Sequence, residues 1–275
     1  MALINKLTEI ADAIREKTGG TDPIALADMP SVISGIQSGG GDIDALIDGS
    51  ITEVTSNAEK ILAYSFYQRT NLTKARFADA IVVDGYAFYG CTSLNEINLP
   101  KVTNFNGSYI LSKCTALTSV NLPLATSAGS YSFRDSASLV TANLPCAESI
   151  GFSSFDGCSK LETVNIPLLK DVESGLFKSC VQLKMVDLPL VKSIASNAFY
   201  TCMRMTALIL RSETVCTLGS TNAFTNCTAY IYVPSSLIDS YKSATNWSTY
   251  AAQFRALEDY TVDGTITGAL DKSKI

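Results

Sequence analysis

The stretch AFYGCTSLNEINLP occupies Ala87 to Pro100, and AFYTCMRMTALIL repeats its pattern from Ala198 to Leu210. A looser copy, FDGCSKLETVNIP, runs from Phe155 to Pro167. Each copy contains a large apolar residue, a cysteine three residues later, and a leucine or methionine three residues after the cysteine. A pattern that returns along one chain predicts a repeat architecture, so its period is the first property to establish.

The leucine after each cysteine serves as a marker of the repeat. Successive markers lie 22 or 23 residues apart, at Leu72, Leu94, Leu117, Leu139, Leu161, Leu183 and Met205. Ile51 fits as a degenerate earlier marker, 21 residues before Leu72. A fixed period of this length is typical of a solenoid, in which each repeat forms one coil that stacks on the next.

Each repeat also has an internal pattern of apolar residues. In LTSVNLP, apolar residues stand three and five positions after the marker, at Val120 and Leu122, and Pro123 follows. This alternation predicts a short strand that the proline ends. A second apolar pair, eight and eleven positions after the marker, as at Val102 and Phe105, predicts a second short extended segment in each coil.

A large apolar residue precedes the cysteine position in every repeat. These residues are Phe66, Phe88, Leu111, Phe133, Phe155, Phe177, Phe199 and Phe224. Equivalent residues of successive coils should stack at the ~4.8 Å spacing of neighbouring strands. The phenylalanines are therefore predicted to form one internal column and the cysteines another.

The cysteines are predicted to be free, buried thiols. Six of the eight occupy the repeat position, Ser136 replaces one, and only Cys146 and Cys216 fall elsewhere. Neighbours in a column have parallel Cα–Cβ bonds, which disfavours disulfides. The chain has no CxxC motif and no histidine to complete a zinc site. Small apolar thiols fit a reducing compartment.

The motif LxxVNLP followed by AFxxCxxL resembles the BspA-like leucine-rich repeats of bacteria, over roughly residues 44–258. The resemblance implies an α+β repeat solenoid, right-handed, with ~22-residue repeats of short strands and helical caps. Departures are local: Ser136 replaces a cysteine, Arg69 stands at another cysteine position, and residues 206–224 carry an insertion. The resemblance also implies a bacterial surface adhesin or host-interaction protein.

Composition and patterning divide the chain into five parts. They are a helical attachment or oligomerisation segment at 1–36, a flexible linker at 37–43, the solenoid at 44–228, a strand–helix cap at 229–258, and a tail or short hairpin at 259–275. In the cap, we expect Ile231 and Val233 in the last strand, a helix from Ser235 through Tyr241, and Trp247 as a buried cap residue.

The N-terminal segment is predicted to attach or oligomerise the protein. Leu3, Leu7, Ile10 and Ile14 line one face of an amphipathic helix, which is too polar for a signal peptide and predicts cytoplasmic synthesis. The string EIADAIREKTGGTDPIALADMPSVISGI is similar to the start of tail-associated proteins of phages and prophages in gut bacteria. This likeness favours a tail appendage, with a virion location, because such particles assemble in the cytosol and leave by lysis.

The bulk composition excludes several classes of function. The net charge is −5 and the pI is about 4.9, so no electrostatic footprint for nucleic acid is present, and no segment is apolar enough to span a membrane. Histidine is absent, and so are the common nucleotide, hydrolase and metalloprotease motifs. We therefore expect a non-enzymatic protein with no catalytic residues, no cofactor and no metal site.

One enzymatic alternative, a polysaccharide depolymerase on a solenoid, requires two carboxylates across a groove. Glu96 and Glu162 are the acids on the middle strands, but they lie three coils apart. At the spacing of neighbouring strands, this separation is ~14 Å, beyond the reach of a glycosidase pair. The alternative therefore has little support.

The candidate binding face consists of the polar residues between the inward positions of the strands. These residues are Asn95, Glu96, Asn98, Thr118, Ser119, Asn121, Thr141, Asn143, Glu162, Thr163, Asn165, Lys184 and Asp187. One interpretation is structural, because asparagine and threonine can hydrogen-bond along a stack. The other is a flat polar face that binds protein or a cell-surface glycan, weakly per site since aromatic anchors are missing, and more strongly in several copies.

Overall fold

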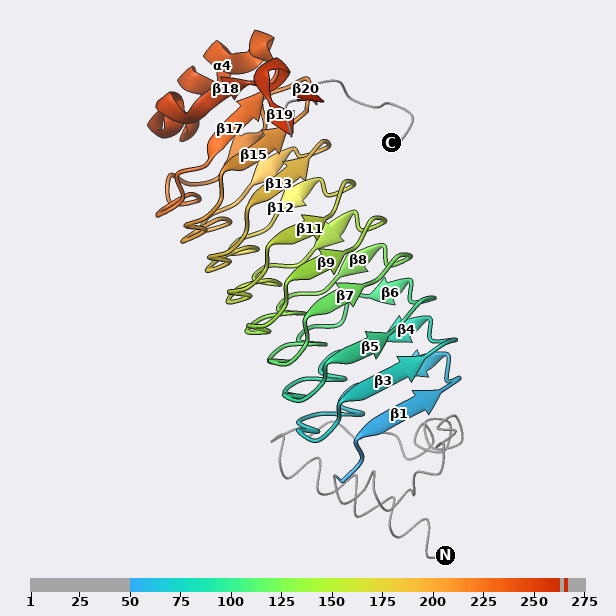
Figure 1. The fold of residues 1–275 in the computed structure, drawn as a ribbon. Coiled ribbons are helices and arrows are strands. Elements are labelled where there is room, and N and C mark those ends of the chain that lie inside the picture. The colour runs from blue at the N-terminus through green and yellow to red at the C-terminus, as the bar shows by residue number, and fades with distance from the viewer. Residues whose placement is uncertain (1–49, 263–264, 267–275) are drawn as a thin grey trace, which may run out of the picture.

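The repeats form successive coils of one elongated solenoid. The computed structural model describes residues 50–262 and 265–266 (Figure 1). The longer strand of each coil has an odd number: β1 (Glu53–Ser56), β3 (Lys74–Phe77), β5 (Glu96–Asn98), β7 (Ser119–Asn121), β9 (Thr141–Asn143), β11 (Thr163–Asn165), β13 (Met185–Leu188), β15 (Ala207–Leu210) and β17 (Tyr230–Val233). These strands lie side by side along the solenoid, as the alternation in the sequence predicts (Figure 1).

A shorter strand forms the second side of each coil. These strands are β2 (Lys60–Ile61), β4 (Val82–Val83), β6 (Asn104–Phe105), β8 (Ser127–Ala128), β10 (Ser149–Ile150), β12 (Asp171–Val172), β14 (Ser193–Ile194) and β16 (Thr217–Leu218). Strands of both sets pair in parallel with their equivalents in the next coil, except between β5 and β7, between β11 and β13 and between β10 and β12, where the pairing is interrupted. Thr163, for example, lies opposite Thr141, 22 residues earlier, so the period in the sequence is the register of the sheet.

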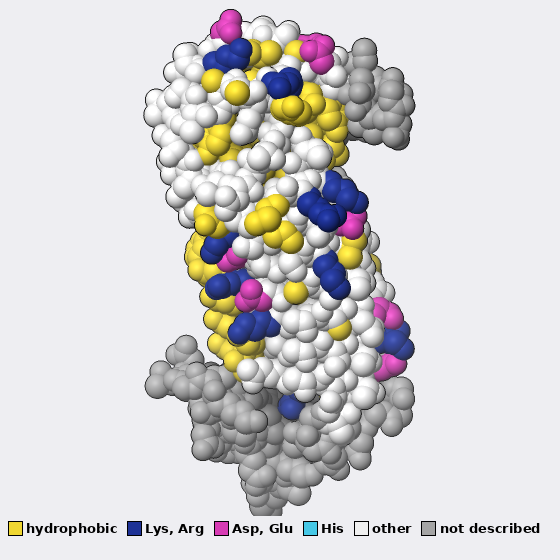
Figure 2. All heavy atoms as spheres, turned by 60° about the vertical axis from the view of Figure 1, so that its left-hand side comes forward, with side chains coloured by type: hydrophobic (Ala, Val, Ile, Leu, Met, Phe, Trp, Pro, Cys, Tyr) yellow, Lys and Arg dark blue, Asp and Glu magenta, His cyan; other side chains and the backbone are white. Residues whose placement is uncertain are grey.

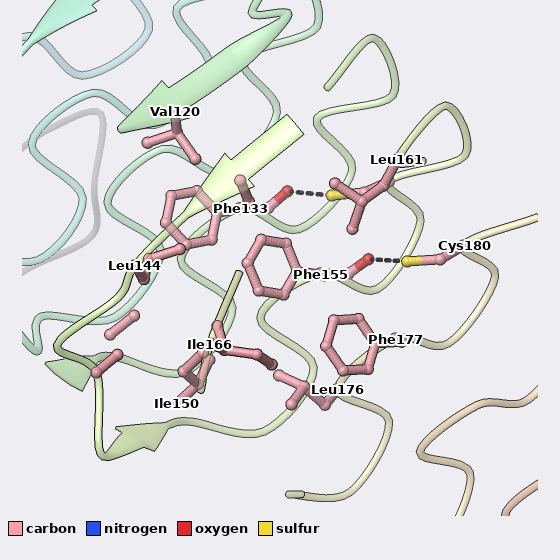
Figure 3. Close-up of a cluster of buried hydrophobic side chains, with 14 of the residues drawn as sticks. Val120, Phe133, Leu144, Ile150, Phe155, Leu161, Ile166, Leu176, Phe177 and Cys180 are labelled. Atoms are coloured by element: carbon pink, nitrogen blue, oxygen red, sulfur yellow. Dashed lines mark hydrogen bonds between the residues drawn. The ribbon is translucent and has the colours of Figure 1, made fainter. Parts of the chain in front are cut away.

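The core follows the predicted columns. The marker residues are all buried, and so are the large apolar residues that precede the cysteine position. Phe133 stacks on Phe155 with ring centroids 4.9 Å apart, and Phe155 stacks on Phe177 at 5.6 Å (Figure 3). Leu111 interrupts the rings, and Phe105 of β6 stacks on Phe133 instead, at 5.6 Å. A ring from a neighbouring position thus replaces the missing one.

The third side of each coil is a turn segment with residues in the left-handed backbone region. In the first described coil these residues are Tyr64 and Gln68, with φ of 62° and 53°. The segment pairs with the next coil through its backbone, since the N–H of Phe66 donates to the carbonyl of Ala87 at 2.8 Å. Successive coils approach closely here: a Cβ on Gly129 would lie 2.2 Å from the Gly107 carbonyl oxygen. Glycine is therefore required at that position.

The C-terminal cap covers the last coil. It contains η1 (Ser235–Leu237), α4 (Ile238–Ser243), η2 (Trp247–Gln253), β18 (Phe254–Ala256) and η3 (Leu257–Asp259). Ile231 and Val233 lie on β17, as expected, but β17 is not the last strand of the sheet, because β18 pairs with it in parallel. After the helices of the cap the chain returns to the sheet as β18. Phe254 of this strand packs against Trp247, with ring centroids 5.7 Å apart.

Trp247 closes the core, as expected of a cap residue. It is fully buried, its ring lies 5.8 Å from that of Phe224, and its Nε1–H donates to the Cys216 carbonyl at 2.7 Å. Beyond the cap, β19 (Thr261–Val262) pairs antiparallel with β20 (Thr265–Ile266). The predicted segments 1–36 and 37–43 lie outside the described residues. No helix within the part that the structure describes has the length and apolarity to cross a membrane.

Candidate binding surfaces

The structure places the predicted binding face along the odd-numbered strands. Ser119, Thr141 and Thr163 lie in register on β7, β9 and β11, and all three are exposed. Asn121 pairs in the same way with Asn143, and Asn143 with Asn165. The remaining uncharged members, Asn95, Asn98 and Thr118, are exposed on the first coils of this face. The face is therefore a regular array of small polar side chains.

The asparagines of this array bond to one another. Nδ2 of Asn143 donates to Oδ1 of Asn121 at 2.7 Å, and Nδ2 of Asn165 donates to Oδ1 of Asn143 at 2.7 Å. Asn121, Asn143 and Asn165 thus hydrogen-bond along the stack, as the structural interpretation expects. The neighbouring column of Ser119, Thr141 and Thr163 remains the more accessible part of the face.

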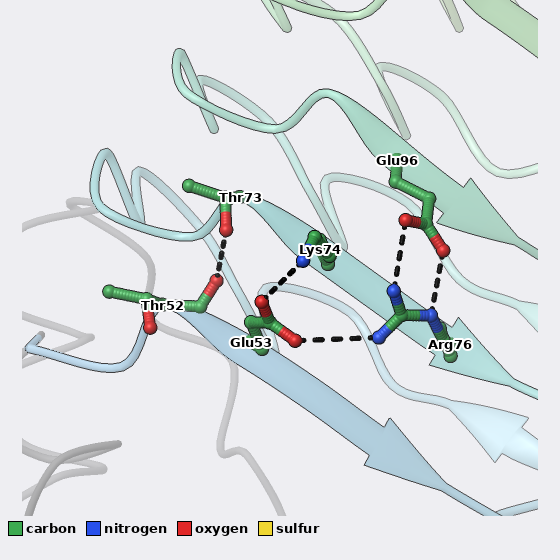
Figure 4. A network of polar contacts seen from close by, with 6 residues as sticks. All are labelled: Thr52, Glu53, Thr73, Lys74, Arg76 and Glu96. Carbon is green, nitrogen blue, oxygen red and sulfur yellow. Dashed lines mark hydrogen bonds and ion pairs between the residues drawn. The ribbon is translucent and has the colours of Figure 1, made fainter.

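The acidic members of the face lie beside basic side chains. Nε and Nη2 of Arg76 donate to the two carboxylate oxygens of Glu96 at 2.6 and 2.9 Å (Figure 4). Arg76 also reaches Glu53 at 3.4 Å, and Lys74 donates to Glu53 at 2.6 Å. The hydrogen bond from Lys74 lowers the pKa of the Glu53 carboxyl below its usual value. These four side chains form one network on β1, β3 and β5.

The same arrangement returns at the other end of the face. Lys184 donates to Glu162, and Nε and Nη2 of Arg211 donate to Asp187 at 3.0 and 2.9 Å. Glu162 and Glu96 are thus each held by a cation of their own. A carboxylate pair that could cleave a glycosidic bond requires two acids flanking one substrate bond, and these two lie on different coils with separate partners. The geometry gives the depolymerase alternative no support.

The cysteine column is part of the hydrogen-bonded core. The thiol of Cys158 donates to the Phe133 carbonyl at 3.0 Å, and that of Cys180 to the Phe155 carbonyl at 3.1 Å (Figure 3). Ser136 donates to the Leu111 carbonyl at 2.8 Å in the same way. The interpretation as merely apolar thiols was therefore incomplete. The occurrence of serine at one position of the column was the signal that a donor is needed there.

Burial makes these thiols poor nucleophiles and poor metal ligands. Loss of solvation raises the pKa of Cys91 to about 12 and the pKa of Cys158 further still. A thiol acts as a nucleophile or ligand in its ionised form, which is negligible here at neutral pH. All eight cysteines are free. In residues 50–262, no group of histidine, cysteine or acidic side chains could hold a metal ion.

A second surface was missed from the sequence and lies on the turn segments. We define the tyrosine patch as Tyr64, Tyr67, Tyr86, Tyr89, Tyr109 and Tyr131, all half-buried. In the sequence, these tyrosines stand two residues before or one residue after the buried aromatic column, in the pattern YxFY of the early repeats. That period could have revealed the patch, but the apolar motif drew attention to the inward residues alone.

Comparison with known proteins defines the class. A family model described as the BspA type leucine rich repeat region matches residues 50–147 and 126–251, in 6 copies. Because these ranges together span most of the chain, the protein belongs to the BspA-type leucine-rich repeat family. Proteins built from these repeats are typically non-enzymatic binding proteins. No curated protein matches the chain in sequence.

Solved structures share the solenoid. The leucine-rich repeat protein TpLRR of T. pallidum is 26% identical, with a TM-score of 0.50 over 53% of this chain and 71% of that chain. A leucine-rich repeat protein of Bacteroides ovatus is 19% identical, with a TM-score of 0.51 over 70% of this chain and 64% of that one. The match thus spans less than two thirds of the Bacteroides protein. Both likenesses support the fold assigned above.

Proposed function

We propose that the protein is a non-enzymatic recognition protein that uses its repeat surface to bind a protein or a cell-surface glycan. The observation that carries this proposal is the in-register array on β7, β9 and β11, where Ser119, Thr141 and Thr163 stand exposed on a rigid parallel sheet. A flat polar array of this kind can make equivalent contacts in each coil, so weak contacts add along the solenoid.

The setting in which it acts is a bacterial surface. Two settings are expected from the sequence: a phage or prophage tail appendage, and a bacterial adhesin or host-interaction protein. The tail setting depends on residues 1–36, which lie outside the described residues, and none of the matches reported above is to a phage protein. The family match covers the repeats and supports the second setting better. We therefore place the surface adhesin first.

The test is binding of the labelled full chain to a panel of gut bacteria and, in parallel, to host cells and matrix proteins. The paired substitution Thr141→Lys with Thr163→Lys places two long cations on the exposed column. Lys74 occupies the equivalent position on β3, so the fold accepts lysine there. We expect saturable binding by the original chain and a loss of about tenfold or more in the paired variant.

A matched control comes from the opposite side of the solenoid. Thr126→Lys adds a cation just before β8, where Lys170 and Lys192 stand in later coils. This variant should bind like the original chain. Equal losses in both variants would show that charge, and not the location of the face, governs binding. Binding to neither bacteria nor matrix proteins would refute the proposed function.

A further inference from the structure

We propose that the tyrosine patch is a second binding surface, and that its ligand is an extended acidic segment of a partner protein. This inference rests on the proposed function, because it supplies a partner class and a location for recognition by the same solenoid. The patch lies on the turn segments, away from the sheet face. The observations that carry it are the stacking of the tyrosines, their backbone conformation and the cations that lie over them.

The tyrosines form two adjacent columns. Tyr64, Tyr86, Tyr109 and Tyr131 stack in order, with ring centroids 5.1, 4.9 and 4.5 Å apart. Tyr67 and Tyr89 stack beside them at 5.2 Å. Figure 2 shows a band of hydrophobic side chains, a class that there includes tyrosine, along one edge of the solenoid's lower half, with charged side chains beside it. The patch is therefore long and narrow, which suits an extended ligand.

The backbone conformation of these tyrosines is costly. Tyr64, Tyr86, Tyr109 and Tyr131 have φ between 58° and 62°. The equivalent positions of later coils hold Ser153, Gly175 and Asn197, which are small or tolerate this region. This region is unfavourable for a bulky residue, and stacking of the rings offsets part of that cost. Since folding does not require tyrosine at this position, four successive tyrosines point to a function.

Cations lie over the patch. The Lys113 ammonium is 5.5 Å from the centroid of Tyr89, and the Arg134 guanidinium is 5.4 Å from that of Tyr131. Lys113 has no ion pair among the residues that the structure describes. Arg134 lies 3.7 Å from carboxylate oxygens of both Asp135 and Asp156. Lys113 is hydrogen-bonded to Tyr89 and lies near Asp135, and no carboxylate of the described residues forms an ion pair with it, so an acidic ligand complements its charge.

The stacking favours a protein ligand over a glycan. Sugars stack on the flat faces of aromatic rings, but the faces within the columns are covered by the neighbouring rings, at interplanar angles of 8° to 19°. These stacked faces are therefore closed to a sugar. Partial burial raises the pKa of Tyr86 and Tyr109, so their hydroxyls remain donors at neutral pH. Rigid tyrosines beside a basic side chain are typical of protein-binding hot spots.

The test uses a library of random linear peptides selected on the immobilised full chain. Enriched peptides are synthesised with a fluorophore, and their dissociation constants are measured by anisotropy. Tyr86→Asn with Tyr109→Asn removes the centre of the patch, and Asn197 shows that asparagine is accepted at this position. Lys113→Asp reverses the charge, and Asp135 stands at the equivalent position of the next coil with the same φ of 59°. Thr141→Lys with Thr163→Lys is the control on the sheet face.

We expect acidic peptides to be enriched, and both patch variants to weaken their binding about tenfold or more while the sheet variant does not. The inference is overturned if no peptide is enriched, if the enriched peptides are not acidic, or if the patch variants bind them normally. Competition by soluble polysaccharide at the patch also overturns it. If only the sheet variant loses binding, the inference fails and the proposed function stands. If peptides bind the patch but the chain binds neither cells nor matrix proteins, the proposed function fails alone.

Discussion

Cys158 and Ser136 occupy equivalent positions in neighbouring coils, and both donate a hydrogen bond to a buried backbone carbonyl of the preceding coil. The repeat spacing alone predicts that such residues are buried and free. The hydrogen bond was not predicted, because its acceptor lies 25 residues earlier in the chain and becomes a neighbour only when the coils stack. Local sequence patterns carry no information on such contacts until the path of the coil is known.

The column predicts an asymmetry between two substitutions of one residue. Cys158→Val keeps an apolar group but removes one of the two hydrogen bonds that the Phe133 carbonyl accepts, since the Ser136 N–H also donates to it at 3.1 Å. It should therefore reduce the free energy of unfolding by about 0.5–1.5 kcal/mol. Cys158→Ser retains a donor, as at Ser136, and should cost less. Urea unfolding followed by circular dichroism measures both. Equal costs for the two variants would mean that volume, and not the hydrogen bond, decides which residue fits.

Within each coil, the strands were predictable and the turn segment was not. The alternation that ends at Pro123 correctly placed β7, because inward and outward residues of a strand differ in polarity. Tyr86 and Tyr109 lie in turn segments and have φ of 59° and 58°, in the left-handed region. A tyrosine in the sequence does not predict that backbone conformation. For this reason the candidate site predicted from sequence included the sheet face and omitted the tyrosine patch. β18 was missed similarly, since Phe254 suits a helix face as well as a strand.

Phe105 takes the place of the ring that is missing at Leu111, and this replacement allows a test of packing between elements. Leu111→Phe would add a ring where Phe105 already fills the column against Phe133. Such overpacking should cost about 1–3 kcal/mol. Adding Phe105→Val, the residue at the equivalent position of β4 and β12, should return the stability to within about 1 kcal/mol of the original chain. Thermal or urea unfolding of the single and double variants measures this coupling, and additive costs would contradict the replacement.

Across the whole molecule, each coil contacts its neighbours, and the last coil depends on the cap. Trp247→Ala removes the ring that lies against Phe224 and should cost about 3–5 kcal/mol. Because the exposed end of a solenoid is apolar, we also expect this variant to self-associate. Circular dichroism and light scattering measure the two effects. Trp247→Phe, which retains a ring but loses the hydrogen bond to Cys216, should be intermediate. A soluble and fully stable Trp247→Ala variant would refute the capping role.

The register of 22 residues between Thr141 and Thr163 has a consequence for how such a protein changes over generations. A duplicated or deleted stretch of one period, in frame, inserts or removes one complete coil and leaves every other contact between neighbours in place. The length of the molecule can therefore change by whole periods while the contacts between the remaining coils stay the same. The repeat surface can thus be lengthened or shortened one coil at a time without a change in the fold of the remaining coils.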